Sequence, residues 1–394
     1  MSHLEWARER TGEMAALLEE LVGIESPSSD PAGVTALARR VGRDLEPLGL
    51  QVELVPVAGA GPILCARVAT GSASAPRPVM LLGHLDTVWP LGTLVERPVR
   101  IEGDRLHGPG AYDMKAGIVV VVFALRALRT RGALPPVTVF LTPLEEVDGG
   151  PYLARMEAAM KDSGAVLGFE PAWPGGAVKT ERKGSGSFVV RAHGRAAHAG
   201  ADPGRGANAI LEMAHQAILA SALTDVARGV SVNVGVIRGG IRPNVVPEHA
   251  EAEFDLRFRT LHDGRRAEEA FRALAPVVPG VSLEVIGGVH YPPLERAPHV
   301  VAVYEHARRV ARDMGMELEE VSTGGASEAS FAAALGIPTL DGLGADGDGA
   351  HAVDEHVLIS SLPERAALAA GLILNLSKGA LAARPLGPPL ASRE

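Results

Sequence analysis

Residues 78–90 read PVMLLGHLDTVWP, an apolar run that ends in two polar residues. The run at 78–83 is typical of a strand covered on both faces, and the Trp-Pro pair breaks the segment. His84 and Asp86 stand two positions apart directly after this strand. These residues alone leave two interpretations open: a polar loop that follows a buried strand, or a metal ligand with a carboxylate that orients its ring.

Apolar runs of the same kind alternate with helical patterns along much of the chain. The expected strands lie at 136–142, 165–170 and 337–342, and the expected helices at 116–132 and 299–314. Each strand is a nearly continuous apolar run, as in parallel sheets with helices on both faces. The alternation therefore predicts an α/β fold with a mostly parallel sheet flanked by helices.

The chain of 394 residues is longer than one hydrophobic core usually supports, so two domains are expected. Near residue 180 the alternation of apolar runs with helical patterns ends. The segments that follow predict a ferredoxin-like α+β unit of order βαββαβ. Its strands are expected at 187–193, 230–238, 250–259 and 281–287, and its helices at 205–221 and 264–275. This predicts a larger domain in two parts, 1–181 and 294–394, with an inserted domain at 182–293.

Composition narrows the classes of partner. The chain has 38 basic and 47 acidic residues, a net charge of −9, and no cluster of Lys and Arg with aromatic residues, so no nucleic-acid partner is expected. No apolar run approaches membrane-spanning length. The charged, amphipathic start and the single cysteine, Cys65, predict a cytoplasmic protein. The expected partner is a small molecule.

Four strand ends and one Gly-rich turn carry side chains with metal-binding chemistry. In an open parallel sheet the loops after neighbouring strands converge at one edge, so these side chains are expected to lie together. Histidines and carboxylates form the ligand set of borderline divalent cations such as zinc. The candidates are His84, Asp86, Asp113, Glu145, Glu146, Glu170 and His351.

Each candidate also has an interpretation that needs no metal. A histidine at a strand end is often a structural residue, and the pair Glu145-Glu146 is compatible with a solvated surface. Asp113 is placed to cap the helix that follows it. The surrounding GPGAYDMKAG lacks the spacing of a dinucleotide-binding or P-loop phosphate motif. Convergence on one sheet edge favours the metal site.

Six motifs, in this order, resemble the M20 family of co-catalytic zinc aminopeptidases, carboxypeptidases and deacylases. They are GHLDTV, GPGAYDMKAG, LEE, GFEP, AHAG and GAH. Within the family, the bacterial glutamate carboxypeptidases of the carboxypeptidase G type are most similar. The resemblance covers nearly the whole chain and implies a mixed, mostly parallel sheet of the zinc-exopeptidase type. It also implies that the insertion is a lid and dimerisation domain, and hence that the protein is a homodimer.

Carried over position by position, the resemblance implies two zinc ions bridged by Asp113. His84 and Glu170 complete one site, and His351 and Glu146 complete the other. A carboxylate is able to span two ions about 3.5–4 Å apart. The same donors would accept Co²⁺ or Mn²⁺. The family also has a cis peptide bond after the bridging aspartate, so the bond after Asp113 is expected to be cis.

The resemblance implies roles for the neighbouring residues as well. Glu145 is the general base that deprotonates a metal-bridging water, and Asp86 accepts the other ring N–H of His84. As neighbours in a strand-like segment, Glu145 and Glu146 are expected to point in different directions. His198 in AAHAG matches a lid histidine that stabilises the oxyanion in the partner subunit's site. The residues alone favour a loop position for His198.

Three residues are expected to bind substrate. Asn244 in RPNVVP and Arg257 in DLRF match residues that contact the scissile carbonyl or the substrate carboxylate, although Arg257 also suits a solvated strand face. The loop TGGASEAS around Gly325 resembles the family's Gly-Gly-Thr/Ser-Asp loop, whose backbone N–H groups bind substrate. Two residues depart from the family: Glu328 replaces the usual Asp, and Leu144 stands where many relatives have an acid.

The sequence thus predicts a dinuclear zinc hydrolase that cleaves the amide bond to a C-terminal amino acid, in the manner of a glutamate carboxypeptidase. Two alternatives stay open. One is an N-acyl-amino-acid deacylase of the aminoacylase or acetylornithine deacetylase type. The other is a non-catalytic relative that binds peptides. The competent residues at all five metal positions and at Glu145 disfavour that last alternative.

Overall fold

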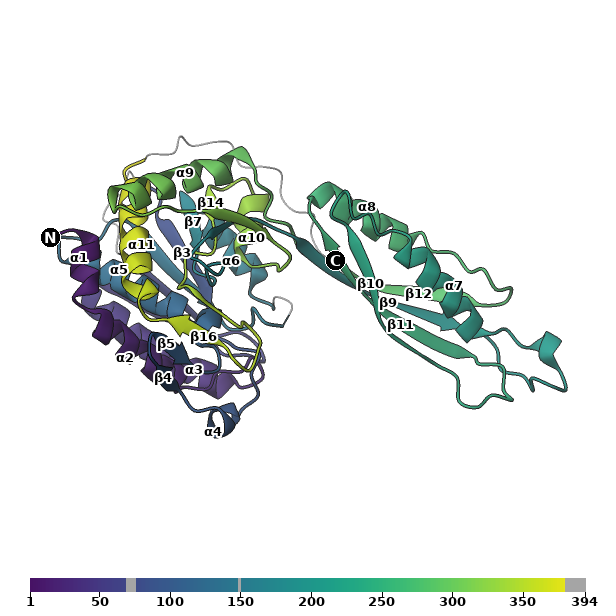
Figure 1. Cartoon of the computed structure of the whole chain (residues 1–394). Helices are drawn as coiled ribbons and strands as arrows, with labels where there is room; N and C mark the ends of the chain where they lie inside the picture. The colour runs from purple at the N-terminus through teal and green to yellow at the C-terminus, as the bar shows by residue number, and fades with distance from the viewer. Residues whose placement is uncertain (69–75, 148–149, 380–394) are drawn as a thin grey trace. The chain divides into compact units, whose positions relative to one another are not determined.

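The computed structural model describes residues 1–68, 76–147 and 150–379. Within them the chain forms two compact units (Figure 1). The larger unit contains the described residues of 1–181, 296–323 and those from 327 onward. The smaller unit contains 182–295 and 324–326. The sequence placed the insertion at 182–293.

A six-stranded mixed sheet forms the centre of the larger unit, in the order β1-β2-β6-β3-β7-β14. β3 pairs in parallel with β6 and β7, and β7 with β14, whereas β1–β2 and β2–β6 are antiparallel. This confirms the expected mixed, mostly parallel sheet. The strands are β1 (Leu50–Val55), β2 (Ile63–Val68), β3 (Val79–His84), β6 (Val137–Thr142), β7 (Ala165–Gly168) and β14 (Thr339–Leu340).

Helices cover both faces of this sheet (Figure 1). On one face, α5 packs against α11, and α1, α2, α3 and α9 surround them. On the other face, α6 contacts α10, and α10 contacts the end of the sheet formed by β7 and β14. Every residue of β3, β6 and β7 is buried, as expected for strands with two covered faces. The helices are α1 (His3–Arg8), α2 (Thr11–Val22), α3 (Pro31–Leu45), α5 (Ala116–Arg129), α6 (Leu153–Lys161), α9 (Pro298–Asp313), α10 (Ala329–Ala334) and α11 (Ser361–Ser377).

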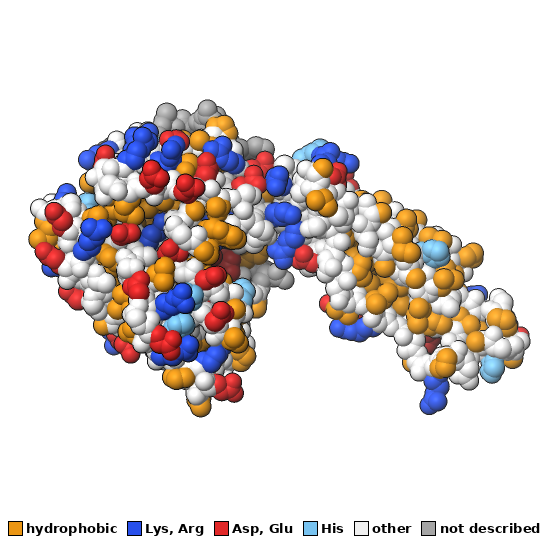
Figure 2. Space-filling view, in the orientation of Figure 1, with side chains coloured by type: hydrophobic (Ala, Val, Ile, Leu, Met, Phe, Trp, Pro, Cys, Tyr) orange, Lys and Arg blue, Asp and Glu red, His pale blue; other side chains and the backbone are white. Residues whose placement is uncertain are grey.

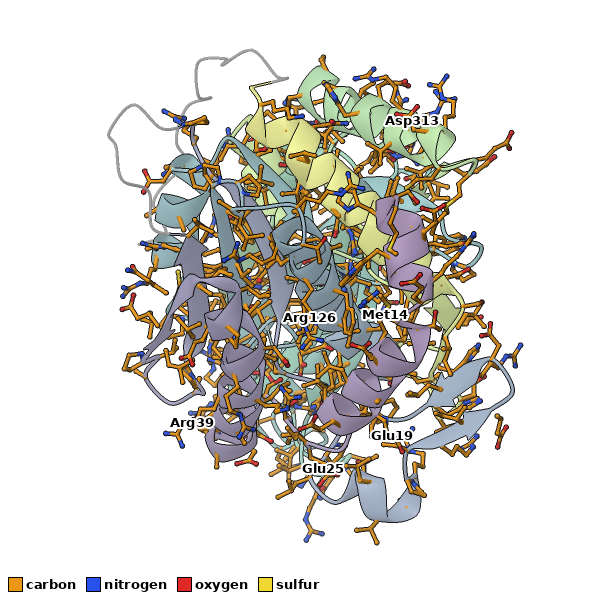
Figure 3. All side chains as sticks on the ribbon, turned by 90° about the vertical axis from the view of Figure 1, so that its left-hand side faces the viewer. Met14, Glu19, Glu25, Arg39, Arg126 and Asp313 are labelled. Atoms are coloured by element: carbon orange, nitrogen blue, oxygen red, sulfur yellow. The ribbon has the colours of Figure 1, made fainter. Side chains whose placement is uncertain are left out.

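The outer helices of this layer are amphipathic. Figure 3 looks onto α2 and α3, where the labelled Glu19 and Arg39 are exposed while Met14 is fully buried. Arg126 of α5 donates to the carboxylate of Asp44 in α3 at 2.7 Å, which ties these two helices together. None of the described helices is long and apolar enough to span a membrane.

Two small sheets complete the larger unit. The first has the order β15-β16-β5-β4 and places β16 beside β5, which runs directly into the Gly-rich turn before α5. The second pairs β8 with β13. Their bounds, with the short helix α4, are β4 (Arg100–Glu102), β5 (Arg105–His107), β8 (Val178–Arg182), β13 (Glu320–Thr323), β15 (Gly347–Asp348), β16 (His356–Leu358) and α4 (Thr93–Glu96).

The smaller unit has the expected βαββαβ order with the sheet order β10-β11-β9-β12, in which all neighbours are antiparallel. One face of the sheet packs against α7 and α8. β11 alternates as its sequence predicts, with the side chains on one face buried and those on the other partly exposed. The elements are β9 (Gly184–His193), α7 (Ala209–Ser221), β10 (Ser231–Gly239), β11 (His249–Phe258), α8 (Leu261–Arg272) and β12 (Ser282–Tyr291).

Candidate metal centre

Three neighbouring strands carry the candidate residues to one edge of the larger sheet. β3 ends at His84, β6 ends just before the Glu145-Glu146 pair, and β7 ends shortly before Glu170. Because β3 pairs in parallel with both β6 and β7, the loops that follow these strands emerge side by side. The sheet therefore gathers these side chains at its carboxyl edge.

Asp113 lies between two histidines that come from distant parts of the chain. Its Oδ1 is 3.2 Å from Nε2 of His84, and its Oδ2 is 3.4 Å from Nε2 of His351. The peptide bond from Asp113 to Met114 is cis, as the sequence resemblance implied. The two oxygens of one carboxylate thus face one imidazole each, an arrangement in which a carboxylate is able to bridge two cations.

Glu170 and Glu146 extend this cluster on its two sides. Glu170 Oε1 lies 3.6 Å from Nε2 of His84, and Glu146 Oε2 lies 3.1 Å from Nε2 of His351. One donor atom from each of His84, Asp113 and Glu146 lies within 4.8 Å of the others, close enough to hold one metal ion. The structure thus joins all five expected ligands by direct contacts.

Asp86 connects two of the loops at this edge. Its fully buried carboxylate accepts the backbone N–H groups of Glu145 at 3.1 Å and Glu146 at 3.2 Å, and the hydroxyl of Ser28 at 2.6 Å. Nδ1 of His84 lies 3.0 Å from the backbone carbonyl oxygen of Asp86 and 3.4 Å from its Oδ1. The main-chain carbonyl is therefore the nearer acceptor for the His84 ring, and the carboxylate holds the glutamate pair.

Glu145 and Glu146 lie in a turn, not in the strand-like segment expected from the sequence. Pro143 follows the last residue of β6 and has no N–H for the ladder, and the turn's own N–H groups bind Asp86. Glu145 is half-buried. Burial, followed by the nearby Glu170 carboxylate, raises the pKa of Glu145 well above its usual value. A carboxyl group with a raised pKa is suited to general acid–base catalysis.

His351 has the backbone conformation of a functional loop. Its φ of 62° lies in the left-handed region, which residues other than glycine rarely adopt. Gly349, two residues earlier, also has a positive φ, of 80°. Such conformations cost free energy and cluster at active sites, where the surrounding structure maintains them. Here the turn brings the imidazole of His351 to Asp113 and Glu146.

The electrostatics of the cluster suit a bound cation. Hydrogen bonds to Asp113 and Glu146 raise the pKa of His351 to about 10. Burial opposes protonation of His84, but the carboxylates of Asp113 and Asp86 outweigh it, and the pKa of His84 lies well above its usual value. Burial raises the pKa of Glu146. The cluster thus concentrates negative charge that a divalent cation would compensate, and its oxygen and imidazole donors fit zinc.

The remaining predicted site residues belong to the smaller unit. Nδ1 of the exposed His198 accepts the backbone N–H groups of Gly200 and Ala201. The carbonyl oxygen of Asn244 accepts the N–H of Ala199 at 3.0 Å, so His198 and Asn244 lie on adjoining segments.

Arg257 lies on β11, where its guanidinium donates to Asp255 at 3.0 Å from Nε. Gly325 is exposed, and its carbonyl oxygen accepts a hydrogen bond from Arg182 at 3.3 Å. Arg257 and Gly325 therefore lie on different segments from those that carry His198 and Asn244.

Two buried carboxylates near the centre were not among the sequence candidates. Glu328, noted only as a departure from the family, accepts the hydroxyls of Tyr152 and Thr142, and burial raises its pKa to about 8. Glu355 is 2% exposed, and burial raises its pKa to about 7. Its position four residues after His351 was the one signal in the sequence that could have indicated it.

Comparison with known proteins identifies the family of this chain. The sequence model of peptidase family M20/M25/M40 matches residues 80–375. The chain belongs to this family. Carboxypeptidase G2 of Pseudomonas sp. (strain RS-16) is 30% identical over 92% of this chain and 89% of the relative. Succinyl-diaminopimelate desuccinylase of Delftia acidovorans is 26% identical over 88% of this chain and 93% of the relative.

A solved M20 family metallo-carboxypeptidase of Sulfolobus solfataricus has the same fold, with a TM-score of 0.71 at 17% identity over 93% of this chain and 99% of that one. As an M20 family member, the protein is a metallohydrolase that acts on peptide or acyl–amino acid bonds.

Proposed function

We propose that this M20 protein is a dinuclear zinc hydrolase that cleaves the amide bond to a C-terminal amino acid, as a glutamate carboxypeptidase does. The observation that carries the proposal is the position of Asp113, whose two oxygens face His84 and His351. A carboxylate whose two oxygens face separate imidazoles is suited to bridging two ions. The 30% identity to carboxypeptidase G2 supports the substrate class.

The nearest histidine–glutamate pairs support a division of the five ligands between two ions, although the group of donors within 4.8 Å takes His84 from one pair and Glu146 from the other. His84 and Glu170, 3.6 Å apart, would hold one zinc, and His351 and Glu146, 3.1 Å apart, would hold the other. Asp113 would contribute one oxygen to each. Each ion then has one neutral imidazole and carboxylate oxygens, and room for water or substrate, as in catalytic zinc sites.

When bound, the two ions polarise the scissile carbonyl and acidify a water molecule. Glu145 takes a proton from the water whose oxygen attacks the carbonyl carbon. As the C–N bond breaks, the same carboxyl group gives that proton to the nitrogen of the leaving amino acid, and the water oxygen remains in the acyl carboxylate. Asp86 holds Glu145 in place through the backbone N–H of the turn.

The lid residues complete this assignment. Because Nδ1 of His198 accepts two N–H groups, the proton of its neutral ring is on Nε2, which makes Nε2 a hydrogen-bond donor. We assign this N–H to stabilisation of the oxyanion in the partner subunit's site, with Asn244 beside it. We assign the guanidinium of Arg257 to the substrate carboxylate and the backbone around Gly325 to the substrate chain.

We infer a homodimer that forms through the smaller unit. Hydrophobic side chains gather on the outer surface of α7 (Figure 2). They are Ile210, Leu211, Ile218 and Leu219, which are 42–71% exposed. β10 is an edge strand of the adjacent sheet, with unpaired backbone groups that a second copy could use. An exposed apolar stripe beside an open strand edge is typical of an interface.

A deacylase is the second candidate function. The identity of 26% to a succinyl-diaminopimelate desuccinylase favours an N-acyl amino acid substrate with the same metal centre. A peptide-binding relative without activity is less well supported, because Glu145 and all five metal positions carry competent side chains. The sequence-based expectation of a cytoplasmic location stays a prediction.

A substrate panel on the purified protein tests the proposal. Zinc analysis is expected to give about two ions per chain. Hydrolysis is then measured for peptidyl and N-acyl substrates that end in Glu, Asp, Ala or Leu. Preference for peptidyl or aroyl glutamate supports the carboxypeptidase, and preference for small acyl groups supports the deacylase. Absence of turnover with zinc, cobalt and manganese would contradict both.

A further inference from the structure

Glu355 is a buried carboxylate whose two oxygens face the loop that carries Asp113. Its Oε1 accepts the backbone N–H of Tyr112 at 2.9 Å and that of Asp113 at 3.1 Å. Its Oε2 accepts the backbone N–H of Gly110 at 2.9 Å and the indole N–H of Trp89 at 2.8 Å. One carboxylate, only 2% exposed, thus binds four N–H groups, about the number of lone-pair sites that it has.

The loop needs such an acceptor because its backbone is not helical. Gly110 has a φ of 72°, and a Cβ there would come within 2.4 Å of Thr87, so the chain turns sharply at this point. Asp113 has φ −113° and ψ 97°, outside the helical region. Buried N–H groups in such a segment cannot pair within a helix, and each would cost free energy without a partner.

Glu355 is itself held by regular structure. β16 begins at the next residue and pairs antiparallel with β5, with His356 opposite His107. β5 ends just before the loop that contains Gly110 and Asp113. The carboxylate and the loop that it binds are therefore anchored to the same small sheet.

We propose that Glu355 is a positioning residue that fixes the backbone of Asp113 so that its carboxylate faces His84 and His351 together. This inference rests on the proposed function, because Glu355 is taken to support the geometry in which Asp113 bridges two ions. Glu355 itself touches neither histidine in any contact among the described residues; it acts through Asp113. Partners that orient metal ligands in this way commonly change metal affinity by about 10–100-fold when they are removed.

Replacement by glutamine separates charge and hydrogen bonding from size. In Glu355→Gln an NH2 group takes the place of one oxygen. This NH2 group is a donor, so it cannot accept the two N–H groups that the oxygen accepted. Whichever way the amide is turned, either the pair at Tyr112 and Asp113 or the pair at Gly110 and Trp89 loses its acceptor. The loop is expected to loosen while the volume stays the same.

The matched control is Glu212→Gln in the smaller unit. Glu212 is also fully buried and also accepts backbone N–H groups, those of Val277 at 2.9 Å and Val278 at 2.6 Å. It has the same chemistry as Glu355 but belongs to the other unit. A loss of stability that is common to any buried carboxylate will therefore appear in both variants, and an effect on the metal centre will appear only in Glu355→Gln.

The experiment uses the full-length protein with two readouts. Amide hydrogen exchange by mass spectrometry follows the segment 108–116, and competition with a chromophoric chelator gives the zinc affinity. Glu355→Gln is expected to exchange faster in this segment and to bind zinc about 10–100-fold more weakly, and Glu212→Gln is expected to match the wild type in both. Trp89→Phe removes one donor and leaves the three backbone contacts, so its zinc affinity is expected to stay within a few-fold of the wild type.

Unchanged exchange in Glu355→Gln overturns the backbone contact as a restraint. Faster exchange with wild-type zinc affinity overturns its role in positioning Asp113. If zinc affinity falls as much in Trp89→Phe as in Glu355→Gln, the backbone contacts of Glu355 are not what supports zinc binding, and that part of the proposal is overturned. Wild-type protein that binds no zinc overturns the proposed function and the positioning role together, and the wild-type measurement tells this result apart from the others.

Discussion

The carboxylate of Asp86 accepts the backbone N–H of Glu145 at 3.1 Å. The two residues follow different strands, β3 and β6, so this hydrogen bond joins the loop of one expected metal ligand to that of the expected base. The backbone carbonyl of Asp86 meanwhile lies 3.0 Å from Nδ1 of His84. One residue therefore sets the relative position of a metal ligand and a proton-transfer group.

Replacement of Asp86 tests this connection. In Asp86→Asn an NH2 group faces the N–H of Glu145 or Glu146, while the backbone carbonyl still meets His84. We expect kcat to fall by at least about 100-fold, because small displacements of a catalytic group are costly. The fold-decrease in zinc affinity is expected to be smaller than the fold-decrease in kcat. The control Ser28→Ala removes one contact, the 2.6 Å hydrogen bond to Asp86, and is expected to keep most of the activity.

Glu145→Gln separates metal binding from catalysis. The amide cannot take a proton from water, so we expect kcat to fall by about 10²–10⁴-fold. The five expected ligands are untouched, so zinc content is expected to match the wild type. Glu146→Gln is the matched neighbour, and it should lose zinc because its side chain contacts His351. Equal zinc loss in both variants would contradict the division of roles between the two glutamates.

We expect Glu328 to make the stability of the fold depend on pH. Burial raises its pKa from 4.5 to about 8, against the hydrogen bonds from Tyr152 and Thr142 and the nearby charge of His84. Between these values the folded protein keeps a proton that the unfolded chain releases, so stability falls as pH rises from about 5 to 8. In chelator-treated protein, Glu328→Gln is expected to reduce this decrease in melting temperature. A variant as pH-dependent as the wild type would show that other groups cause it.

The strands were predictable because their signal is local. The run 78–83 is apolar at nearly every position, and β3 is buried throughout. The helix starts were less well predicted. The helix expected from 205 begins at Ala209, because the side chain of Asn208 accepts the N–H of Leu211. The helix expected from 264 begins at Leu261, because Thr260 caps it. Both caps were visible in the sequence as residue types favoured at helix starts.

The support of the metal centre was not predictable in the same way. The partners of Glu355 are mainly backbone N–H groups, one of them 242 residues earlier in the chain. Backbone groups carry no residue-type signal, so no motif marks such a contact. The carboxylate of Asp86 was likewise expected to serve the His84 ring, and the structure shows that it also holds the N–H groups of Glu145 and Glu146. Side-chain types thus indicated the ligands, and tertiary structure showed what orients them.

The apolar surface of α7 gives a test of assembly. Ile218 is 71% exposed, and a charge at this position would be buried without a partner in the proposed dimer. We expect Ile218→Asp to sediment as a monomer at concentrations where the wild type is a dimer. The control Arg265→Glu changes an exposed residue of α8 and is expected to stay dimeric. A wild-type protein that is monomeric over the whole concentration range would contradict the interface.

Mixed dimers test whether His198 acts on the partner subunit. Glu145→Gln and His198→Ala are each expected to be nearly inactive as pure proteins. If His198 serves the opposite site, a mixed dimer contains one site with both Glu145 and His198. Random exchange of subunits is then expected to restore about a quarter of the wild-type rate, since half of the dimers are mixed and half of their sites are complete.

The control is the double variant, Glu145→Gln with His198→Ala, mixed with Glu145→Gln. Both of its subunits lack Glu145, so no site in this mixture is complete. Recovery only in the first mixture supports action across the interface, and no recovery despite subunit exchange places His198 in its own subunit's site or outside catalysis.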